Sequence, residues 1–239
     1  MLKLDFVKAF DIVNWDGLFS VMHARGFCHR WINWMSDILS SSETSLLVNG
    51  CPGLWITCKR GLCQGDPISP YLFLLVAETL QGMIRNCTAI RHPTEDAMSC
   101  AVLQYADDTL IVFRANSAAA THLWEILDNF ASITGLHINF SKSTLVPIHV
   151  EHPVLNSYVT ILGYRKESFP QQYLGLPLSV NKLPVSAFSP YIHKADKYLG
   201  SWQVNLLNTM GRSVLVNVVL DALLVYFMSS MQLPPAVIQ

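Results

Sequence analysis

The sequence has no C-x-x-C pair and no N-terminal signal-peptide pattern, although it contains six cysteines. Structural zinc sites use such close pairs, and disulfide frameworks belong to secreted proteins. We therefore expect reduced, buried thiols and an intracellular protein, either nuclear or cytoplasmic. The cysteines are Cys28, Cys51, Cys58, Cys63, Cys87 and Cys100.

Long apolar runs are also scarce. The longest, Val214 to Met228, is short for a lipid bilayer, and Asn217 and Asp221 interrupt it. This pattern predicts a buried helix and no association with a membrane. The sequence contains no repeat, no low-complexity segment and no polybasic cluster of the kind that targets proteins.

Charge of either sign is sparse as well. The 16 basic and 17 acidic residues give a net charge of −1, and charged residues make up only 14% of the chain. Binding to nucleic acid needs clustered Lys and Arg, so any such surface must be local. Because 51% of the residues are hydrophobic, disorder is not expected, and 239 residues can bury one sizeable core or a domain plus part of a second.

The most informative stretch is residues 101–113, which read Ala-Val-Leu-Gln-Tyr-Ala-Asp-Asp-Thr-Leu-Ile-Val-Phe. Two apolar runs flank a short acidic segment, which predicts two strands joined by a tight turn. The adjacent carboxylates of Asp107 and Asp108 would repel each other by roughly 4 kcal/mol at ~4 Å and an effective dielectric constant near 20. A divalent cation is the natural compensation, so the hairpin predicts a metal site.

A second carboxylate occurs at the start of the chain. Residues 1–10 begin as a strand, with Leu4 and Phe6 on one side and Asp5 on the other. A lone Asp in a strand is usually a solvated surface residue. If this strand neighbours the acidic hairpin, however, Asp5 and Asp107 can share metal ions.

The other patterns predict a mixture of helices and strands. Helical spacing of apolar residues predicts helices on either side of Gly26 and a helix that begins after Ser117 as N-cap and ends at Gly135. The remaining expected elements are a hairpin at 45–58 whose turn is lengthened by Cys-Pro-Gly, a helix at 71–85, a loop at 86–99 and a strand at 136–140.

Five segments together resemble the reverse transcriptases of non-LTR (LINE-type) retrotransposons. Residues 3–11, Lys-Leu-Asp-Phe-Val-Lys-Ala-Phe-Asp, are similar to the first catalytic strand, and Tyr105-Ala106-Asp107-Asp108 to the catalytic hairpin. The other three are Gly-Leu-Cys-Gln-Gly-Asp-Pro-Ile-Ser-Pro at 61–70, Gly-Leu-His-Ile-Asn-Phe-Ser-Lys-Ser at 135–143 and Tyr-Leu-Gly-Leu-Pro-Leu at 173–178. The resemblance covers nearly the whole chain.

The resemblance implies an α+β fold: a ferredoxin-like polymerase palm, with a split βαβ antiparallel sheet and helices on one face. It places the palm at residues 1–178 and the start of a helical, thumb-like segment at residues 179–239. The first strand and the acidic hairpin would be central neighbours in the sheet.

The resemblance also implies an RNA-directed DNA polymerase that uses two Mg²⁺ ions, with Mn²⁺ as a possible substitute, to add deoxynucleotides to a primer 3′-end. Its partners would be an RNA template, a DNA primer and deoxynucleoside triphosphates. The implied catalytic residues are the metal ligands Asp5, Asp107 and Asp108, and Lys142, which would protonate or neutralise the leaving pyrophosphate. The implied nucleotide- and template-binding residues are Phe6, Phe10, Gln64, Gly65, Tyr105 and Ala106, and the implied primer grip is Tyr173, Leu174 and Gly175.

The sequence leaves open the role of Phe10 and three interpretations of the whole chain, of which the polymerase palm is the first. Phe10 is either the ring that excludes a 2′-hydroxyl or an ordinary core residue. Relatives carry a basic fingers region before the first strand, which makes a fragment or a non-catalytic relic that binds nucleic acid or protein a second interpretation of the chain. The third is another palm enzyme such as a nucleotide cyclase, which would lack the Gln64-Gly65 segment and the thumb-like tail. The sequence sets no oligomeric state.

Overall fold

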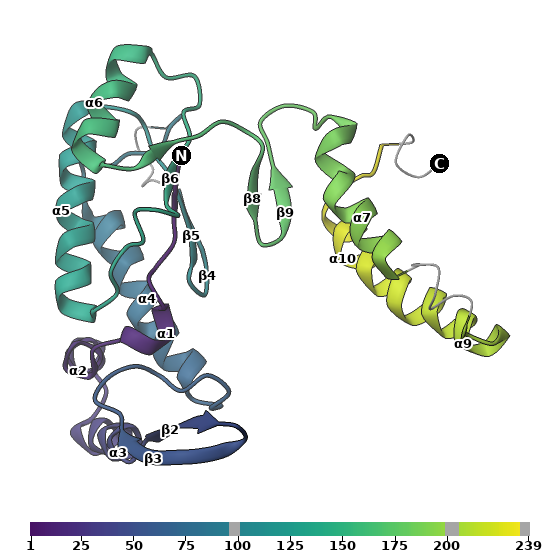
Figure 1. Ribbon diagram of the computed structural model, residues 1–239. Coiled ribbons are helices and arrows are strands. Elements are labelled where there is room, and N and C mark those ends of the chain that lie inside the picture. Colours follow the sequence, from purple (N-terminus) through teal and green to yellow (C-terminus); the bar gives the residue numbers. More distant parts are fainter. Residues whose placement is uncertain (96–100, 199–205, 235–239) are drawn as a thin grey trace. The chain divides into compact units, whose positions relative to one another are not determined.

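The computed structural model describes residues 1–95, 101–198 and 206–234, so Cys100 lies outside the described residues. The chain divides into two compact units, Met1–Glu167 and Ser168–Gln239 (Figure 1). The first unit contains the acidic hairpin and the first strand.

A five-stranded sheet forms the centre of the first unit, in the order β4-β5-β1-β6-β7. Its strands are β1 (Leu2–Leu4), β4 (Ala101–Tyr105), β5 (Asp108–Val112), β6 (Thr144–Leu145) and β7 (Arg165–Lys166). β1 pairs directly with β5, which confirms that the first strand and the acidic hairpin are neighbours. The sheet is predominantly antiparallel, as the sequence predicts, and only β6 and β7 at its edge pair in parallel.

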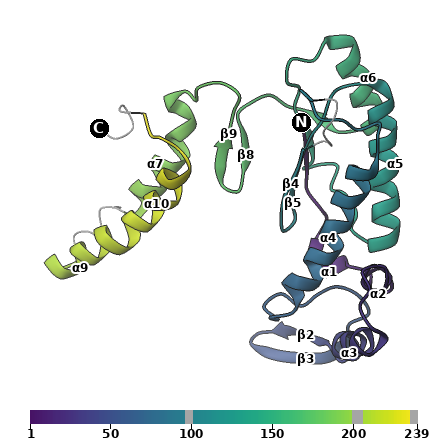
Figure 2. The ribbon, with the colours of Figure 1, turned by 180° about the vertical axis from the view of Figure 1, so that it is seen from behind.

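Two long helices, α4 (Ser69–Asn86) and α5 (Ser117–Thr134), pack against one another and help to form the core with the sheet, and α6 (His152–Leu162) packs on α5 (Figures 1 and 2). Alternation along β1 turns Leu2 and Leu4 into this core, where both are fully buried. The same core cluster includes Phe73, Val76, Leu80, Ile111, Leu123, Leu127 and Phe130.

Three shorter helices follow β1: α1 (Ala9–Ile12), α2 (Trp15–Ala24) and α3 (His29–Ser40). Gly26, with φ of +82°, separates α2 from α3, as the sequence predicts. The sequence predicts Ser117 as the N-cap of α5, but the cap lies one residue earlier, because the Asn116 side chain accepts a hydrogen bond from the Ala119 amide.

A two-stranded hairpin, β2 (Glu43–Val48) and β3 (Cys51–Thr57), follows α3. Asn49 and Gly50 both have positive φ, which is the pattern of a two-residue type I′ turn. Cys-Pro-Gly therefore lies within β3 and does not lengthen the turn, and the register shifts between Ser45 and Leu47 instead. That part of the prediction is wrong.

Two further expectations are corrected. Residues 136–140 do not form a strand: Ile138 makes a single bridge to Phe6, and the strand that pairs with β1 lies later, at Thr144–Leu145. The five cysteines that the structure describes are free, but Cys28, Cys51 and Cys63 are exposed and the other two only half-buried, so the expected burial is wrong.

The second unit contains a small hairpin and a series of helices. Its elements are β8 (Gln171–Tyr173), β9 (Leu176–Leu178), η1 (Val185–Phe188), α7 (Ser189–Tyr198), α9 (Thr209–Val214), the π-helix η2 (Leu215–Leu220) and α10 (Asp221–Ser230). The apolar run at 214–228 is helical as predicted, but Val214, Val218 and Val225 are more than half exposed, so it is not buried throughout. Across the residues with described positions, no helix has the length and apolar character needed to span a bilayer.

Candidate active site

The register between β1 and β5 sets the geometry of the acidic residues. Leu4 pairs with Thr109 as the last pair of this ladder, and continuing the same register by one residue brings Asp5 opposite Asp108. Directly opposed residues in an antiparallel pair point to the same face, with Cβ atoms about 4.5–5.5 Å apart. Since Leu2 and Leu4 point into the core, Asp5 and Asp108 lie on the other face of the sheet.

The turn of the acidic hairpin has an unusual backbone. Tyr105 pairs with Asp108, which leaves Ala106 and Asp107 as a two-residue loop. Ala106 has φ of +51° and Asp107 does not share this sign, which matches a type II′ turn. Glycine normally occupies that position, and a residue with a Cβ there costs on the order of 1–3 kcal/mol. The strained residue therefore sits beside the predicted catalytic carboxylates.

Electrostatic interactions couple these carboxylates. The pKa of Asp108 is raised above its usual range, first by burial and then by the negative charge of Asp107, with Asp5 adding a smaller increase. The ammonium of Lys3 acts in the opposite direction and lowers this pKa. Asp5, Asp107 and the positive charge of Lys3 therefore all lie within electrostatic range of Asp108.

The backbone of Asp5 is fixed by a segment far away in the sequence. The Asp5 backbone amide donates a hydrogen bond to the Ser143 hydroxyl at 3.1 Å. The same hydroxyl donates a hydrogen bond to the Asp5 carbonyl oxygen at 3.4 Å. The Asn139 amide donates to the same carbonyl at 2.8 Å. Ser143 is fully buried, whereas the preceding Lys142 is exposed. Sequence reasoning missed Ser143 and Asn139, because neither carries a signal that links it to Asp5.

The two aromatic residues near Asp5 have different surroundings. Phe6 is buried, with its ring 6.1 Å from that of Phe130 on α5, so its side chain faces the core. Phe10 is half-buried and stacks on Phe73 of α4, with ring centroids 4.5 Å apart. Phe10 thus packs on the core and still has an accessible edge, so both of its proposed roles are compatible with this position.

The Gln64-Gly65 loop is tied to the segment that follows Asp5. The Leu62 amide donates to the Phe10 carbonyl at 2.7 Å, and the Trp15 indole donates to the Gly61 carbonyl at 2.7 Å. Gln64 and Gly65 themselves are exposed, and a Cβ at Gly65 would meet nothing within 4 Å. These bonds bring the loop close to Phe10 and leave Gln64 accessible to a ligand.

In the second unit, Tyr173 ends β8 and Leu174 and Gly175 form the turn to β9, both with positive φ. Two tyrosine hydroxyls hold this turn. Tyr226 of α10 donates to the Leu174 carbonyl at 2.6 Å, and Tyr191 of α7 donates to the Gly175 carbonyl at 2.5 Å. No local sequence pattern predicts this support by two helices.

The donor chemistry on the acidic face suits Mg²⁺, which prefers carboxylate oxygens and retained water. The carboxylates are not gathered into a finished cage, however: among residues 1–95, 101–198 and 206–234, no three His, Cys, Asp or Glu side chains are arranged so that they could hold an ion. The fit therefore rests on the shared face and the electrostatic coupling, and side-chain movement would have to complete the ligand set.

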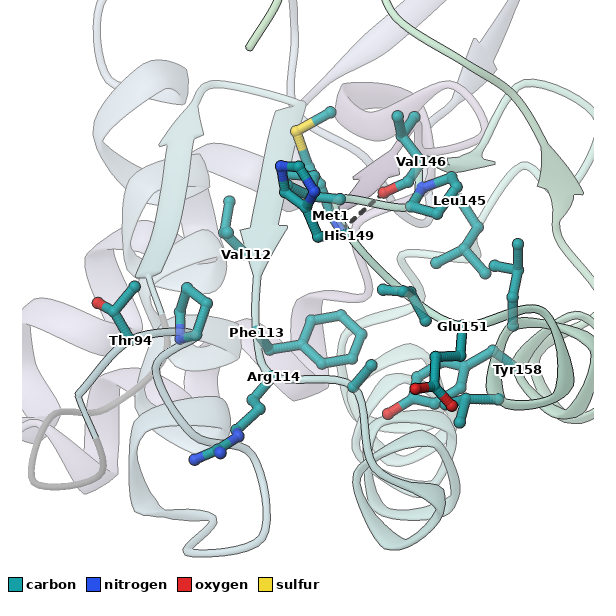
Figure 3. A pocket seen from close by; sticks show the side chains of 17 residues that line it. Met1, Thr94, Val112, Phe113, Arg114, Leu145, Val146, His149, Glu151 and Tyr158 are labelled. Atoms are coloured by element: carbon teal, nitrogen blue, oxygen red, sulfur yellow. Dashed lines mark hydrogen bonds between the residues drawn. The ribbon is translucent and has the colours of Figure 1, made fainter.

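A cavity of about 630 Å³ lies elsewhere in the first unit (Figure 3). It is lined by Val112 and Phe113, at and beyond the end of β5 that lies away from Asp108, and by Tyr158 of α6. The amino group of Met1 donates to the Val146 carbonyl here at 3.0 Å, and burial lowers its pKa to about 6. The cavity lies at the opposite end of β5 from the carboxylates, so it is separate from the acidic face. The acidic face is the candidate active site because it carries the predicted metal ligands.

Comparison with known proteins identifies the class. The family described as "Reverse transcriptase (RNA-dependent DNA polymerase)" matches residues 1–178. The fold is also similar to a telomerase from Candida tropicalis, solved with a fragment of telomeric RNA, with a TM-score of 0.52, 12% identity, and coverage of 95% of this chain and 39% of that one. This chain therefore belongs to the reverse transcriptase family.

The most similar curated relatives indicate which type of reverse transcriptase this domain is. The chain is 26% identical to the transposon TX1 uncharacterized 149 kDa protein of Xenopus laevis over 90% of its length and 17% of that protein. It is 30% identical to a Pol polyprotein from the type-1 retrotransposable element R2 of Popillia japonica, over 62% of its length and 21% of that protein. The chain is thus a reverse transcriptase domain of the non-LTR retrotransposon type, and it spans about a fifth of these relatives.

Proposed function

We propose that residues 1–178 form the catalytic palm of an RNA-directed DNA polymerase, and that residues 179–239 form the start of its thumb. The reaction is the addition of deoxynucleotides to the 3′-end of a DNA primer on an RNA template. The observation that carries this proposal is the β1–β5 register, which supports a common face for Asp5 and Asp108 next to the turn that holds Asp107.

On this face the three carboxylates would hold two Mg²⁺ ions, or Mn²⁺, which supply acidification of the primer hydroxyl and charge neutralisation of the triphosphate. The residues of the chain prepare this site. Ser143 and Asn139 fix the backbone that carries Asp5, and the type II′ turn fixes Asp107. Lys3 partly offsets the acidic charge before ions bind.

Residues around the acids would position the substrates. The accessible edge of Phe10 would contact the sugar of the incoming nucleotide, where a 2′-hydroxyl would collide with the ring. Gln64 can donate and accept hydrogen bonds at a base or sugar, and Gly65 permits close approach of the backbone. Phe6 would contribute through its backbone, since its ring is buried. Tyr105 and Ala106 would line the template side of the turn.

Two further segments complete the proposal. The mobile ammonium of Lys142 would protonate or neutralise the leaving pyrophosphate, a role that its exposure and its place beside Ser143 support. The turn at Tyr173, Leu174 and Gly175 would support the primer terminus, held by the hydroxyls of Tyr191 and Tyr226.

Primer extension tests this proposal. Purified protein is incubated with an oligo(dT) primer on poly(rA), dTTP and Mg²⁺ or Mn²⁺, and compared with Asp5→Ala and with Asp128→Ala, which changes an exposed acid on α5. We expect extension by the wild type and Asp128→Ala and none by Asp5→Ala. Equal extension by all three would contradict the assignment.

One observation favours the second candidate, a non-catalytic relic: the described carboxylates are not preassembled into an ion cage. A relic would show no extension with either metal ion. Retained metal binding without extension would identify a domain that keeps its carboxylates but not its activity.

A further inference from the structure

Lys3 is the middle residue of β1, and the alternation of the strand places it on the acidic face. Leu2 and Leu4 point into the core, so the side chain between them lies on the opposite face, together with that of Asp5. Residues two positions apart along a strand are separated by roughly 7 Å. Lys3 and Asp5 are therefore close neighbours on the face that carries the candidate metal ligands.

The pairing of β1 with β5 brings Lys3 near Asp108 as well. Lys3 lies directly opposite Leu110, and Asp108 is two residues before Leu110 on β5. Such diagonal neighbours in an antiparallel pair are about 7–8 Å apart, which is within reach of a long side chain. The four-carbon stem of Lys3 can therefore carry its ammonium group towards both Asp5 and Asp108. The lowering effect of Lys3 on the pKa of Asp108 agrees with this placement.

The surroundings of Lys3 strengthen its attraction to the carboxylates. Its direct neighbours on the two adjoining strands are Leu110 on β5 and Thr144 on β6. Leu110 is 1% exposed and Thr144 is 5% exposed, and Lys3 itself is half-buried. Charges interact more strongly where protein atoms replace water. Salt therefore screens this attraction less than that of an ion pair on the open surface.

We infer that Lys3 is a built-in competitor of the metal ions, because its ammonium group compensates Asp5 and Asp108 in the metal-free protein and opposes the binding of divalent cations there. Lys3 is a positioning residue and not a catalytic residue. Its charge stabilises the empty site and lowers the affinity of that site for cations. The second effect rests on the proposed function, since it requires that the carboxylates bind ions. The first effect does not.

Three variants test this inference. Lys3→Met removes the charge and keeps an unbranched apolar stem, so it preserves most of the packing of the side chain. Lys3→Arg keeps the positive charge and should rescue the wild-type behaviour. Lys166→Met is the matched control, because it makes the same change in the same sheet. Lys166 lies opposite the core residue Leu145 and thus on the other face from Lys3.

Mn²⁺ titration followed by electron paramagnetic resonance is the first measurement. We expect Lys3→Met to bind Mn²⁺ about three- to tenfold more tightly than the wild type, and Lys3→Arg and Lys166→Met to stay within about twofold of it. Unchanged or weaker binding by Lys3→Met, or an equal gain by Lys166→Met, would overturn the competitor role and leave the proposed function intact. No Mn²⁺ binding by any of the four proteins would overturn both.

Urea unfolding of the metal-free protein in EDTA is the second measurement. At low salt, Lys3→Met should lower the urea midpoint and Lys3→Arg should not, and the difference should shrink at high salt because ions screen the charges. In an Asp108→Asn background, Lys3→Met should lower the midpoint less, since one partner charge is already gone. A loss that is the same in both backgrounds, or that Lys3→Arg shares, would mean that packing and not charge is responsible, and would overturn the inference.

Discussion

The hydroxyl of Ser143 lies 3.1 Å from the backbone nitrogen of Asp5 and 3.4 Å from its carbonyl oxygen, although the two residues are 138 positions apart. One fully buried side chain thus satisfies two backbone groups at the point where β1 ends. The position of the first candidate metal ligand consequently depends on the segment that carries Lys142.

Replacing Ser143 should loosen this arrangement. Ser143→Ala removes the hydroxyl and leaves the Asp5 amide without that partner, which costs about 1–3 kcal/mol for a buried group. We expect a lower free energy of unfolding in urea and weaker Mn²⁺ binding. Ser132→Ala, on the exposed side of α5, is the control and should change neither quantity. Unchanged Mn²⁺ affinity in Ser143→Ala would separate this residue from the site.

The raised pKa of Asp108 predicts a pH dependence. A carboxyl whose pKa is higher in the folded than in the unfolded state binds protons more readily when folded, so the metal-free protein loses stability as the pH rises through that pKa. After burial, Asp107 is the largest cause of the shift. Asp107→Asn should therefore lower the pKa of Asp108. The free energy of unfolding of this variant should fall less than that of the wild type as the pH rises.

Carbon-detected NMR titration of the Asp108 carboxyl in the wild type and in Asp107→Asn measures this directly. Asp128→Asn supplies a control that removes a charge elsewhere on the surface. An Asp108 pKa that is identical in the wild type and Asp107→Asn would mean that the two carboxylates do not interact.

The loop that carries Gln64 begins at a glycine that tolerates no side chain. A Cβ on Gly61 would lie 2.5 Å from the Asp11 carbonyl oxygen, and φ is +85°. Gly61→Ala should lower the free energy of unfolding, measured by thermal or urea denaturation, by about 2 kcal/mol or more. Gly82→Ala, in α4 where nothing lies within 4 Å of the added Cβ, should instead stabilise the protein by about 0.5–1 kcal/mol. The same sign for both substitutions would argue against this conformation of the loop.

The turn between β8 and β9 depends on its tyrosine partners. Tyr226→Phe removes the hydrogen bond to the Leu174 carbonyl, which is worth about 0.5–1.5 kcal/mol, with the lower end expected because Tyr226 is half exposed. Amides of the turn should exchange faster with solvent. Tyr71→Phe, on α4, should leave their exchange rates unchanged. If Tyr226→Phe also leaves them unchanged, the helix does not hold the turn.

Local patterns were enough to predict the elements that position the site. Two β-branched runs around Tyr105-Ala106-Asp107-Asp108 indicated a tight hairpin, and the structure has one with a two-residue loop. Alternation at the start of the chain placed Asp5 on the side away from the core. The helices α4 and α5 followed from apolar spacing, since each buries one face.

The predictions failed where a distant partner decides the outcome. Residues 136–140 alternate like a strand, but the backbone of Asn139 and the hydroxyl of Ser143 form hydrogen bonds with the backbone of Asp5. The strand that pairs with β1 therefore starts only at Thr144. The hydroxyls that support Leu174 and Gly175 come from helices 16 and 52 residues later. The exposure of Cys51 follows from the unpartnered hairpin, which composition alone does not reveal.

Mn²⁺ titration followed by electron paramagnetic resonance tests most directly whether Asp5, Asp107 and Asp108 share a cation site. We predict that the wild type and Asp128→Asn bind Mn²⁺ with the same affinity, and that Asp5→Asn and Asp107→Asn each weaken binding about tenfold or more, equivalent to at least about 1.4 kcal/mol. Indistinguishable binding by all four proteins would contradict the account.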